Sequence, residues 1–261
     1  MTRLTPFRLH RPTSVAEASG LLREIGRDAV PYCGGTELLL VAKLGFTAFT
    51  DLVDLKRIDE LSGIALADRA SSAPDEISAA NSTITGLRIG ATSTHREIEH
   101  SDLVRSSWPA LAELERHVGN VRVRNVGTIG GNLAFADPHS DPATYLAAVG
   151  GSVSISGASD SSGADSRRSV PVEEFVIAPY MTALDHGELL TSVDVPAMLP
   201  GDAVVHRKMS FHERPAITVS VRVCVSDGVV TRTRIAVGSV GPRVERALAA
   251  EQQLDLALVD G

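Results

Sequence analysis

The sequence predicts an α+β protein in which a two-lobed N-terminal part precedes a smaller α+β C-terminal domain with an antiparallel sheet. Three observations predict this fold. A helix signal follows residue 13, a strand, a glycine turn and a helix start occupy residues 29–44, and alternating polar and apolar residues dominate after residue 188. We expect the two lobes to span residues 1–56 and 57–168, and the C-terminal domain to span 169–261.

The first lobe begins with a helix. Ser14-x-x-Glu17 has the form of a capping box, and Gly26 is a stop signal. Between them, apolar residues recur at helical spacing, namely Val15, Ala18, Leu21, Leu22 and Ile25. Residues 29–33 then favour a buried strand, 36–44 a short helix and 51–55 a second strand, which together make a β-α-β unit.

The second lobe is predicted from shorter signals. Strands are expected over 64–66 and 84–90 around a polar, exposed loop at 67–82. Thr94-x-x-Glu97 is a second capping box, and helices are expected over 103–118, interrupted by Pro109, and over 141–149. Residues 152–169, rich in serine and glycine, indicate a strand end and a mobile loop, and the domain boundary is placed there.

The C-terminal domain is predicted from alternation of polar and apolar residues. Antiparallel strands are expected over 188–195, 204–211, 217–225 and 229–240, followed by a last helix from 242 to about 250.

Composition narrows the class of protein without identifying it. The chain has 261 residues, of which 43% are hydrophobic and 22% charged, as in ordinary globular proteins. A net charge of −7 without a basic cluster argues against a nucleic-acid partner. No apolar run is long enough to span a membrane and the N-terminus lacks a signal-peptide core, so a cytoplasmic location is expected.

Two glycine segments carry the functional signal. In the first, residues 29–43, a short apolar run meets Gly34-Gly35-Thr36 and then a helical pattern, and free N–H groups at such a helix start suit a pyrophosphate. In the second, residues 122–141, Gly127, Gly130 and Gly131 allow positive φ or close approach to a ligand beside hydroxyl, amide and carboxylate side chains. Neither a G-x-G-x-x-G fingerprint nor a Walker loop occurs, so a different architecture would hold the anion.

These segments resemble the FAD-binding medium subunit of molybdenum hydroxylases, the family of xanthine dehydrogenase and carbon monoxide dehydrogenase. The resemblance rests on Gly34-Gly35-Thr36-Glu37-Leu38, on residues 124–133 (RNVGTIGGNL), and on Ala136-Asp137-Pro138 with Asp141-Pro142. Weaker matches lie at residues 10–14, 175–190 and 206–208. The family implies a two-lobed FAD-binding domain of the vanillyl-alcohol-oxidase/PCMH type and a C-terminal domain that commonly continues further than residue 261.

The resemblance also implies roles for individual residues. The backbone of residues 33–38 would hold the FAD pyrophosphate, residues 128–132 would line the phosphates and ribityl chain, Asp141 would hydrogen-bond a sugar or ribityl hydroxyl, and Lys208 would lie beside the flavin. The cofactor-binding residues expected on this basis are Cys33, Gly34, Gly35, Thr36, Glu37, Leu38, Thr128, Gly130, Gly131, Asn132, Asp141 and Lys208. No catalytic residue and no metal ligand is expected.

Several residues in these segments have a second interpretation. Lys208 could instead be a solvated lysine on an edge strand, and Cys33 could serve packing alone. Tyr180 could shield an isoalloxazine ring or be a core tyrosine. Arg122 and Arg124 could face an anionic cofactor or cap a helix end.

Two histidine patterns are weaker candidates for chemistry. His95 and His100 are five residues apart, whereas a helical zinc pair is four apart. His139-Ser140-Asp141 contains the residue types of a catalytic triad, but consecutive residues do not form a nucleophile–base line, so turn chemistry is the better interpretation.

The cysteine count bears on partners. Cys33 and Cys224 cannot supply the four thiolates of an iron–sulfur cluster. By the resemblance, two [2Fe–2S] clusters would lie on a small subunit and the molybdenum cofactor on a large subunit, assembled with this chain as a dimer of heterotrimers. This chain would pass electrons from the clusters through FAD to an external acceptor. The alternatives are a self-contained FAD-dependent oxidase or dehydrogenase, and a non-enzymatic interaction protein of the same fold.

Overall fold

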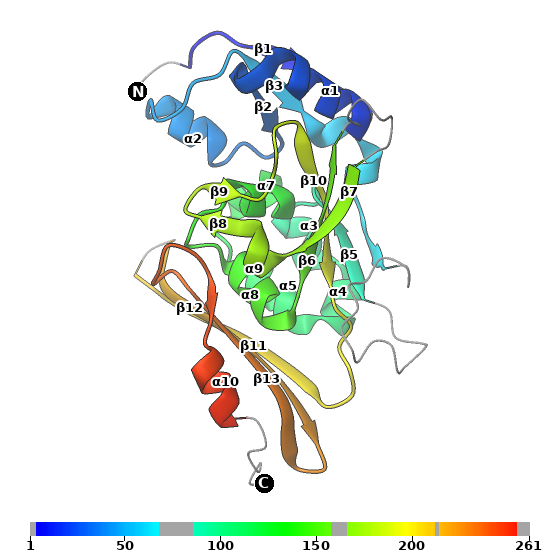
Figure 1. Ribbon diagram of the computed structural model, residues 1–261, viewed down its shortest axis with the longest axis vertical. Helices are drawn as coiled ribbons and strands as arrows, with labels where there is room; N and C mark the ends of the chain where they lie inside the picture. The colour runs from blue at the N-terminus through cyan, green and yellow to red at the C-terminus, as the bar shows by residue number, and fades with distance from the viewer. Residues whose placement is uncertain (1–3, 68–85, 158–165, 212–213, 255–261) are drawn as a thin grey trace.

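Three sheets follow one another along the long axis of the molecule, with the N-terminal sheet at one end and the C-terminal sheet at the other (Figure 1). The computed structural model describes residues 4–67, 86–157, 166–211 and 214–254. The predicted mixture of helices and sheets is confirmed. Within the described residues, no helix is both long and apolar enough to cross a membrane.

The first sheet is parallel, with the strand order β1-β3-β2. The predicted β-α-β unit is present, and β1, which is too short for a sequence pattern, adds a third strand. The predicted capping box is only half formed, because Ser14 accepts from the Glu17 N–H while the Glu17 carboxylate accepts from the Thr13 N–H. The elements are β1 (Arg8–His10), α1 (Val15–Ile25), β2 (Ala29–Tyr32), α2 (Leu38–Lys43) and β3 (Asp51–Asp54).

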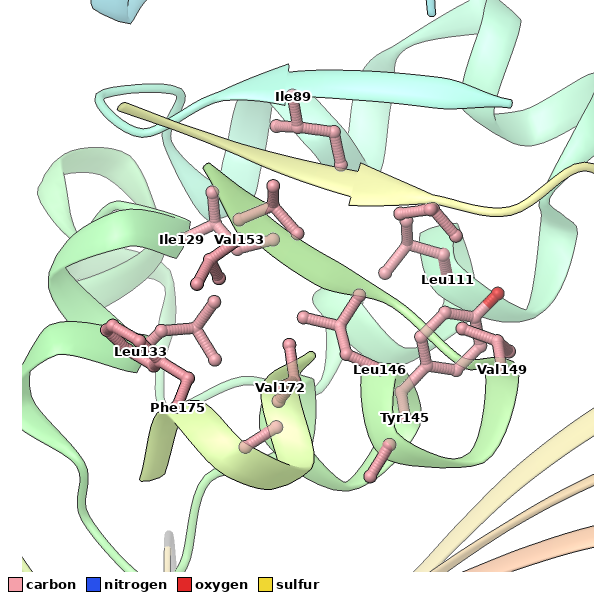
Figure 2. Close-up of a cluster of buried hydrophobic side chains, with 14 of the residues drawn as sticks. Ile89, Leu111, Ile129, Leu133, Tyr145, Leu146, Val149, Val153, Val172 and Phe175 are labelled. Atoms are coloured by element: carbon pink, nitrogen blue, oxygen red, sulfur yellow. The ribbon is translucent and has the colours of Figure 1, made fainter. Parts of the chain in front are cut away.

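The second sheet is antiparallel, with the order β4-β5-β10-β6-β7, and it covers most of the hydrophobic core. Ile89, Leu146, Val153 and Phe175 meet in this core (Figure 2). The strands are β4 (Ile64–Leu66), β5 (Leu87–Gly90), β6 (Ser152–Gly157), β7 (Ser166–Pro171) and β10 (Glu188–Val195). The helices of this lobe are α3 (His95–His100), α4 (Asp102–Ser107), α5 (Pro109–Arg116), α6 (Val121–Val126), α7 (Ile129–Phe135), α8 (Asp141–Val149) and α9 (Val172–Phe175).

Some predictions from local sequence signals in this lobe agree with the structure, and others do not. The Thr94–Glu97 capping box is complete, and Pro109 begins α5 after the break that it predicted. The stretch at 152–169 was predicted to be a strand end and a mobile loop. Its two described ends are instead both strands, β6 and β7, which pair antiparallel, and its middle lies outside the described residues. The alternate residues Val153 and Ile155 are buried in the core, and this burial favours a strand despite the loop-like composition. Most of the predicted loop at 67–82 lies outside the described residues.

Strand β10 joins the second lobe although it follows the predicted boundary near residue 168. It pairs with both β5 and β6 and so lies in the middle of the five-stranded sheet. The boundaries of the three predicted parts stay a prediction, and this pairing favours placing the second one between β10 and the next strand, β11.

The C-terminal sheet is antiparallel, with the order β11-β12-β13-β14. The helix predicted from residue 242 starts later than expected. Residues 245 and 246 pair with β13, and the helix begins at Leu248. A two-stranded hairpin, β8-β9, precedes β10. The bounds are β8 (Val176–Ala178), β9 (Met181–Thr182), β11 (Asp202–Ser210), β12 (Pro215–Ser226), β13 (Val229–Gly238), β14 (Glu245–Arg246) and α10 (Leu248–Leu254).

Candidate cofactor-binding cleft

A cleft of about 590 Å³ lies where the first lobe meets the helices of the second. This volume is in the range of small-molecule sites. Residues 33–38 line one side, and Gly127, Thr128 and residues 130–132 line the other. Of the twelve residues expected from the sequence to bind a cofactor, only Lys208 is not part of the lining; the others are Cys33, Gly34, Gly35, Thr36, Glu37, Leu38, Thr128, Gly130, Gly131, Asn132 and Asp141.

The two glycine segments touch each other at one end of this cleft. A Cβ on Gly34 would lie 2.8 Å from the Gly127 Cα, and one on Gly130 would lie 2.6 Å from the Ala91 carbonyl oxygen. Gly35 has a φ of +68°, but Gly127, Gly130 and Gly131 do not have positive φ. The glycines of the second segment therefore permit close packing of backbone on backbone and do not serve left-handed turns.

The second segment is helical, not turn-rich as the sequence predicted. Helices α6 and α7 flank Gly127, and Thr128 caps α7 by accepting from the Gly131 N–H at 3.1 Å. The N–H groups of Ile129 and Gly130 donate to the Ser93 and Ala91 carbonyl oxygens. These amides are committed to the fold, so this segment supplies a surface and side chains, with few free donors.

The first segment differs in this respect. Helix α2 begins at Leu38, two residues later than predicted, and Glu37 at its N-cap makes no side-chain cap. In the described part of the chain, the backbone N–H groups of Gly35, Thr36, Glu37 and Leu38 have no hydrogen-bond partner. All four residues line the cleft. Unpaired backbone donors beside a cleft are suited to an anion.

The charged side chains around the cleft are mainly acidic. The carboxylates are those of Glu37, Asp137, Asp141 and Glu188, and the guanidinium is that of Arg214. Arg214 lies 3.0 Å from Asp137 and 3.7 Å from Glu37. Burial raises the pKa of Glu37, Arg214 opposes this rise, and the charge of Asp137 adds to it. Burial likewise raises the pKa of the Cys33 thiol.

Asp141 and Lys208 form an ion pair at the back of the cleft. The Lys208 Nζ lies 2.7 Å from Asp141 Oδ2 and also donates to the His117 carbonyl oxygen, and the Asp141 side chain is buried. His206 Nε2 lies 3.5 Å from Asp141 Oδ1. The interpretation of Lys208 as a solvated lysine is wrong, because Asp141 and the His117 carbonyl surround its ammonium group.

Tyr180 is neither buried nor part of the cleft lining. It is 57% exposed, so its interpretation as a core tyrosine is wrong. Its ring packs edge-on against that of Phe135, a lining residue, with 5.3 Å between the ring centroids. Its φ of +60° is unusual for an aromatic residue and is held by a hydrogen bond from its N–H to the Ala136 carbonyl oxygen.

The other candidates from the sequence serve the fold. Arg124 donates to the Val118 carbonyl oxygen and pairs with Glu99, outside the cleft lining, and Arg122 is exposed and also outside it. The three consecutive residues from His139 to Asp141 have separate partners: His139 contacts Asp137, Ser140 caps α8, and Asp141 pairs with Lys208. They form no nucleophile–base line.

His95 was considered from the sequence only as a zinc ligand, and the structure gives it a different setting. It lines the cleft, is almost fully buried, and its Nδ1 lies 2.6 Å from the buried carboxylate of Glu115. His100 instead contacts Arg105. The spacing of His95 and Glu115, on two different helices, gave no sequence signal.

Comparison with known proteins agrees with this fold. Residues 5–198 match the family model described as "FAD binding domain in molybdopterin dehydrogenase", and the chain belongs to this family. It is 32% identical over 250 residues to the carbon monoxide dehydrogenase medium chain of Hydrogenophaga pseudoflava, covering 95% of this chain and 79% of that one. It is 26% identical to the xanthine dehydrogenase FAD-binding subunit of Escherichia coli O157:H7, over 93% of this chain and 77% of the relative.

Solved structures agree as well. Carbon monoxide dehydrogenase from Hydrogenophaga pseudoflava superposes with a TM-score of 0.87 and 31% identity, covering 99% of this chain and 83% of the other. Quinoline 2-oxidoreductase from Pseudomonas putida 86 gives 0.83 and 27% over the same shares. The predicted family is confirmed, and with it the assignment as an FAD-binding oxidoreductase component.

Proposed function

We propose that the chain binds FAD in the cleft and acts as the electron-transfer subunit of a multi-subunit molybdenum hydroxylase. Electrons would arrive from [2Fe–2S] clusters on a small partner subunit and leave to an external acceptor, while substrate is hydroxylated on a large molybdenum subunit. We further propose a PCMH-type arrangement of the two lobes, a dimer of heterotrimers and a cytoplasmic location.

The observation that carries the proposal is the row of unpaired backbone N–H groups from Gly35 to Leu38. The cations beside the lining carboxylates are already paired with them, Arg214 with Asp137, Lys208 with Asp141 and Arg168 with Glu188, so side-chain charge does not favour an anion. A diphosphate would therefore depend on hydrogen bonds from these uncharged backbone N–H groups. The close packing at Gly34 and Gly130 leaves no room for a Cβ, and so holds neighbouring backbone segments together beside the cleft.

Other residues would then position the rest of the cofactor. Ser140 donates to Asn132 Oδ1, which leaves the Asn132 amide N–H groups for the ligand. Asp141, held by Lys208, offers a fixed carboxylate to a ligand hydroxyl. The edge-on ring of Tyr180 buttresses Phe135 at the cleft wall.

Bound FAD would supply the ability to accept electrons singly and to deliver them singly or in pairs. The chain would provide position and electrostatic surroundings for that chemistry. An electron-transfer role requires no general base over the cofactor, and accordingly we assign no catalytic residue.

Titration of purified protein with FAD tests the proposal. We expect saturable binding by calorimetry at one FAD per chain, with the absorbance bands of bound flavin. Protein that stays colourless and gives no heat with FAD would refute the proposal and favour a non-enzymatic interaction protein. If binding occurs, candidate substrates should reduce the flavin only when the partner subunits are present. Reduction of the isolated chain would instead indicate a self-contained oxidase or dehydrogenase.

A further inference from the structure

We infer that His95 is a further ligand-binding residue of the cleft, donating a hydrogen bond from Nε2 to a diphosphate oxygen. This inference rests on the proposed binding of FAD. It gives the diphosphate a donor from the second lobe, opposite the first-lobe amides.

The geometry fixes one edge of the imidazole and leaves the other free. Nδ1 contacts Glu115 at 2.6 Å, and neither His95 nor Glu115 is more than 2% exposed. No described residue hydrogen-bonds to His95 Nε2, although the ring lines the cleft. Unlike Glu115 Oε1, His95 Nε2 is not sealed inside the protein, so a ligand atom in the cleft that the ring lines can accept from it.

The proton on Nε2 follows from the burial of the pair. Among the described residues, Glu115 has no ion-pair partner other than His95. Burying a net charge here is unfavourable, so we take the pair to be neutral overall. If it is an imidazolium with a carboxylate, both ring nitrogens carry protons. If it is an imidazole with a carboxylic acid, the acid donates to Nδ1, and the ring proton is on Nε2. In both states Nε2 is a donor.

The location of the ring selects the diphosphate as acceptor. The His95 Cδ2, which is bonded to Nε2, lies 3.3 Å from where a Cβ on Gly127 would be. Gly127 is the residue that Gly34 approaches, so the ring stands where the two glycine segments meet. The backbone N–H of His95 donates to the Gly127 carbonyl oxygen at 3.0 Å, and this bond fixes the start of α3 beside Gly127.

The test compares the wild type with the double variant His95→Leu/Glu115→Leu, which removes the pair without leaving a buried charge. FAD affinity is measured by calorimetry, and the two ³¹P resonances of bound FAD are recorded. The matched control is His100→Leu, on the same helix but outside the cleft lining. The single variant His95→Gln, which keeps a side-chain N–H donor, tests for rescue.

We expect the double variant to bind FAD about ten- to hundredfold more weakly, the usual effect of losing a hydrogen bond to a charged group, and one ³¹P resonance to move. His95→Gln should recover part of the affinity, and His100→Leu should match the wild type. Equal affinity, or weaker binding with unmoved ³¹P resonances, would overturn the inference. If the wild type itself fails to bind FAD, the proposed function fails instead.

Discussion

Gly34 in the first lobe and Gly127 in the second are in direct backbone contact: a Cβ added to Gly34 would lie 2.8 Å from the Gly127 Cα. The atoms that it would meet, which include the Val126 carbonyl oxygen, are backbone atoms and cannot rotate away. The contact thus sets the separation of the two lobes at one end of the cleft, and both lobes contribute to the lining because of it.

Gly34→Ala is therefore expected to weaken both the fold and FAD binding. Overpacking of this kind costs about 1–3 kcal/mol of unfolding free energy. Urea unfolding can be followed by the emission of Trp108, the sole tryptophan, which is buried. The control is Gly20→Ala, within α1 with no atom within 4 Å of the added Cβ, which should stabilise the protein by about 0.5–1 kcal/mol. Equal stabilities for both alanine variants would contradict the contact.

Arg214→Ala should weaken FAD binding without unfolding the protein. Arg214 partly neutralises Asp137 and Glu37, so its loss leaves the cleft more negative toward a diphosphate. Because its side chain is half exposed, we expect about a threefold loss of affinity at low salt, which disappears at high salt. Calorimetry at two salt concentrations measures this. Arg207→Ala is the control, since Arg207 is exposed and outside the cleft lining. A loss independent of salt would argue against the electrostatic explanation.

Asp141 and Lys208 should be energetically coupled. Lys208→Met leaves a buried carboxylate beside His206 alone, and breaking a buried pair in this way costs on the order of 3 kcal/mol. Adding Asp141→Asn should restore part of the stability, because the uncompensated charge is gone. A double-mutant cycle of urea unfolding free energies measures the coupling. Additive effects would mean that the pair contributes nothing as a pair.

Much of the first lobe and of the lining of the cleft was predictable because their signals are local. The strand, glycine turn and helix at 29–44 needed only neighbouring residues, and the family resemblance brought residues 127–132 to the same site. The contact between Gly34 and Gly127 itself required the fold. So did the pairing of His95 with Glu115, because no spacing rule connects side chains on two helices.

The errors have physical causes too. Serine at alternate positions of β6 looked like loop composition, yet Ser154 donates to Asp194 Oδ2 and is satisfied within the sheet. The glycines of the second segment suggested turns, but helices α6 and α7 pack so closely on Ala91 and Gly34 that only glycine fits. Lys208 sits on the sheet edge strand β11, and only the tertiary structure shows that Asp141 lies opposite it.

The first lobe should lose stability in acid through Asp51. Its buried carboxylate contacts Arg8, His10 and Thr50, and the hydrogen bond from Arg8, followed by those from the other two, holds the pKa of Asp51 well below its usual range. A lowered folded-state pKa stabilises the protein above the unfolded-state pKa, and this contribution is lost as pH falls toward the folded-state pKa. Wild type should thus be more stable than Asp51→Asn at neutral pH, and the difference should shrink below about pH 4. Urea unfolding of both proteins from about pH 7 to about pH 3 measures it, with the exposed Glu24→Gln as control for loss of a surface carboxylate. A difference that stays constant across this range would show that the Asp51 contacts contribute through shape and not through charge.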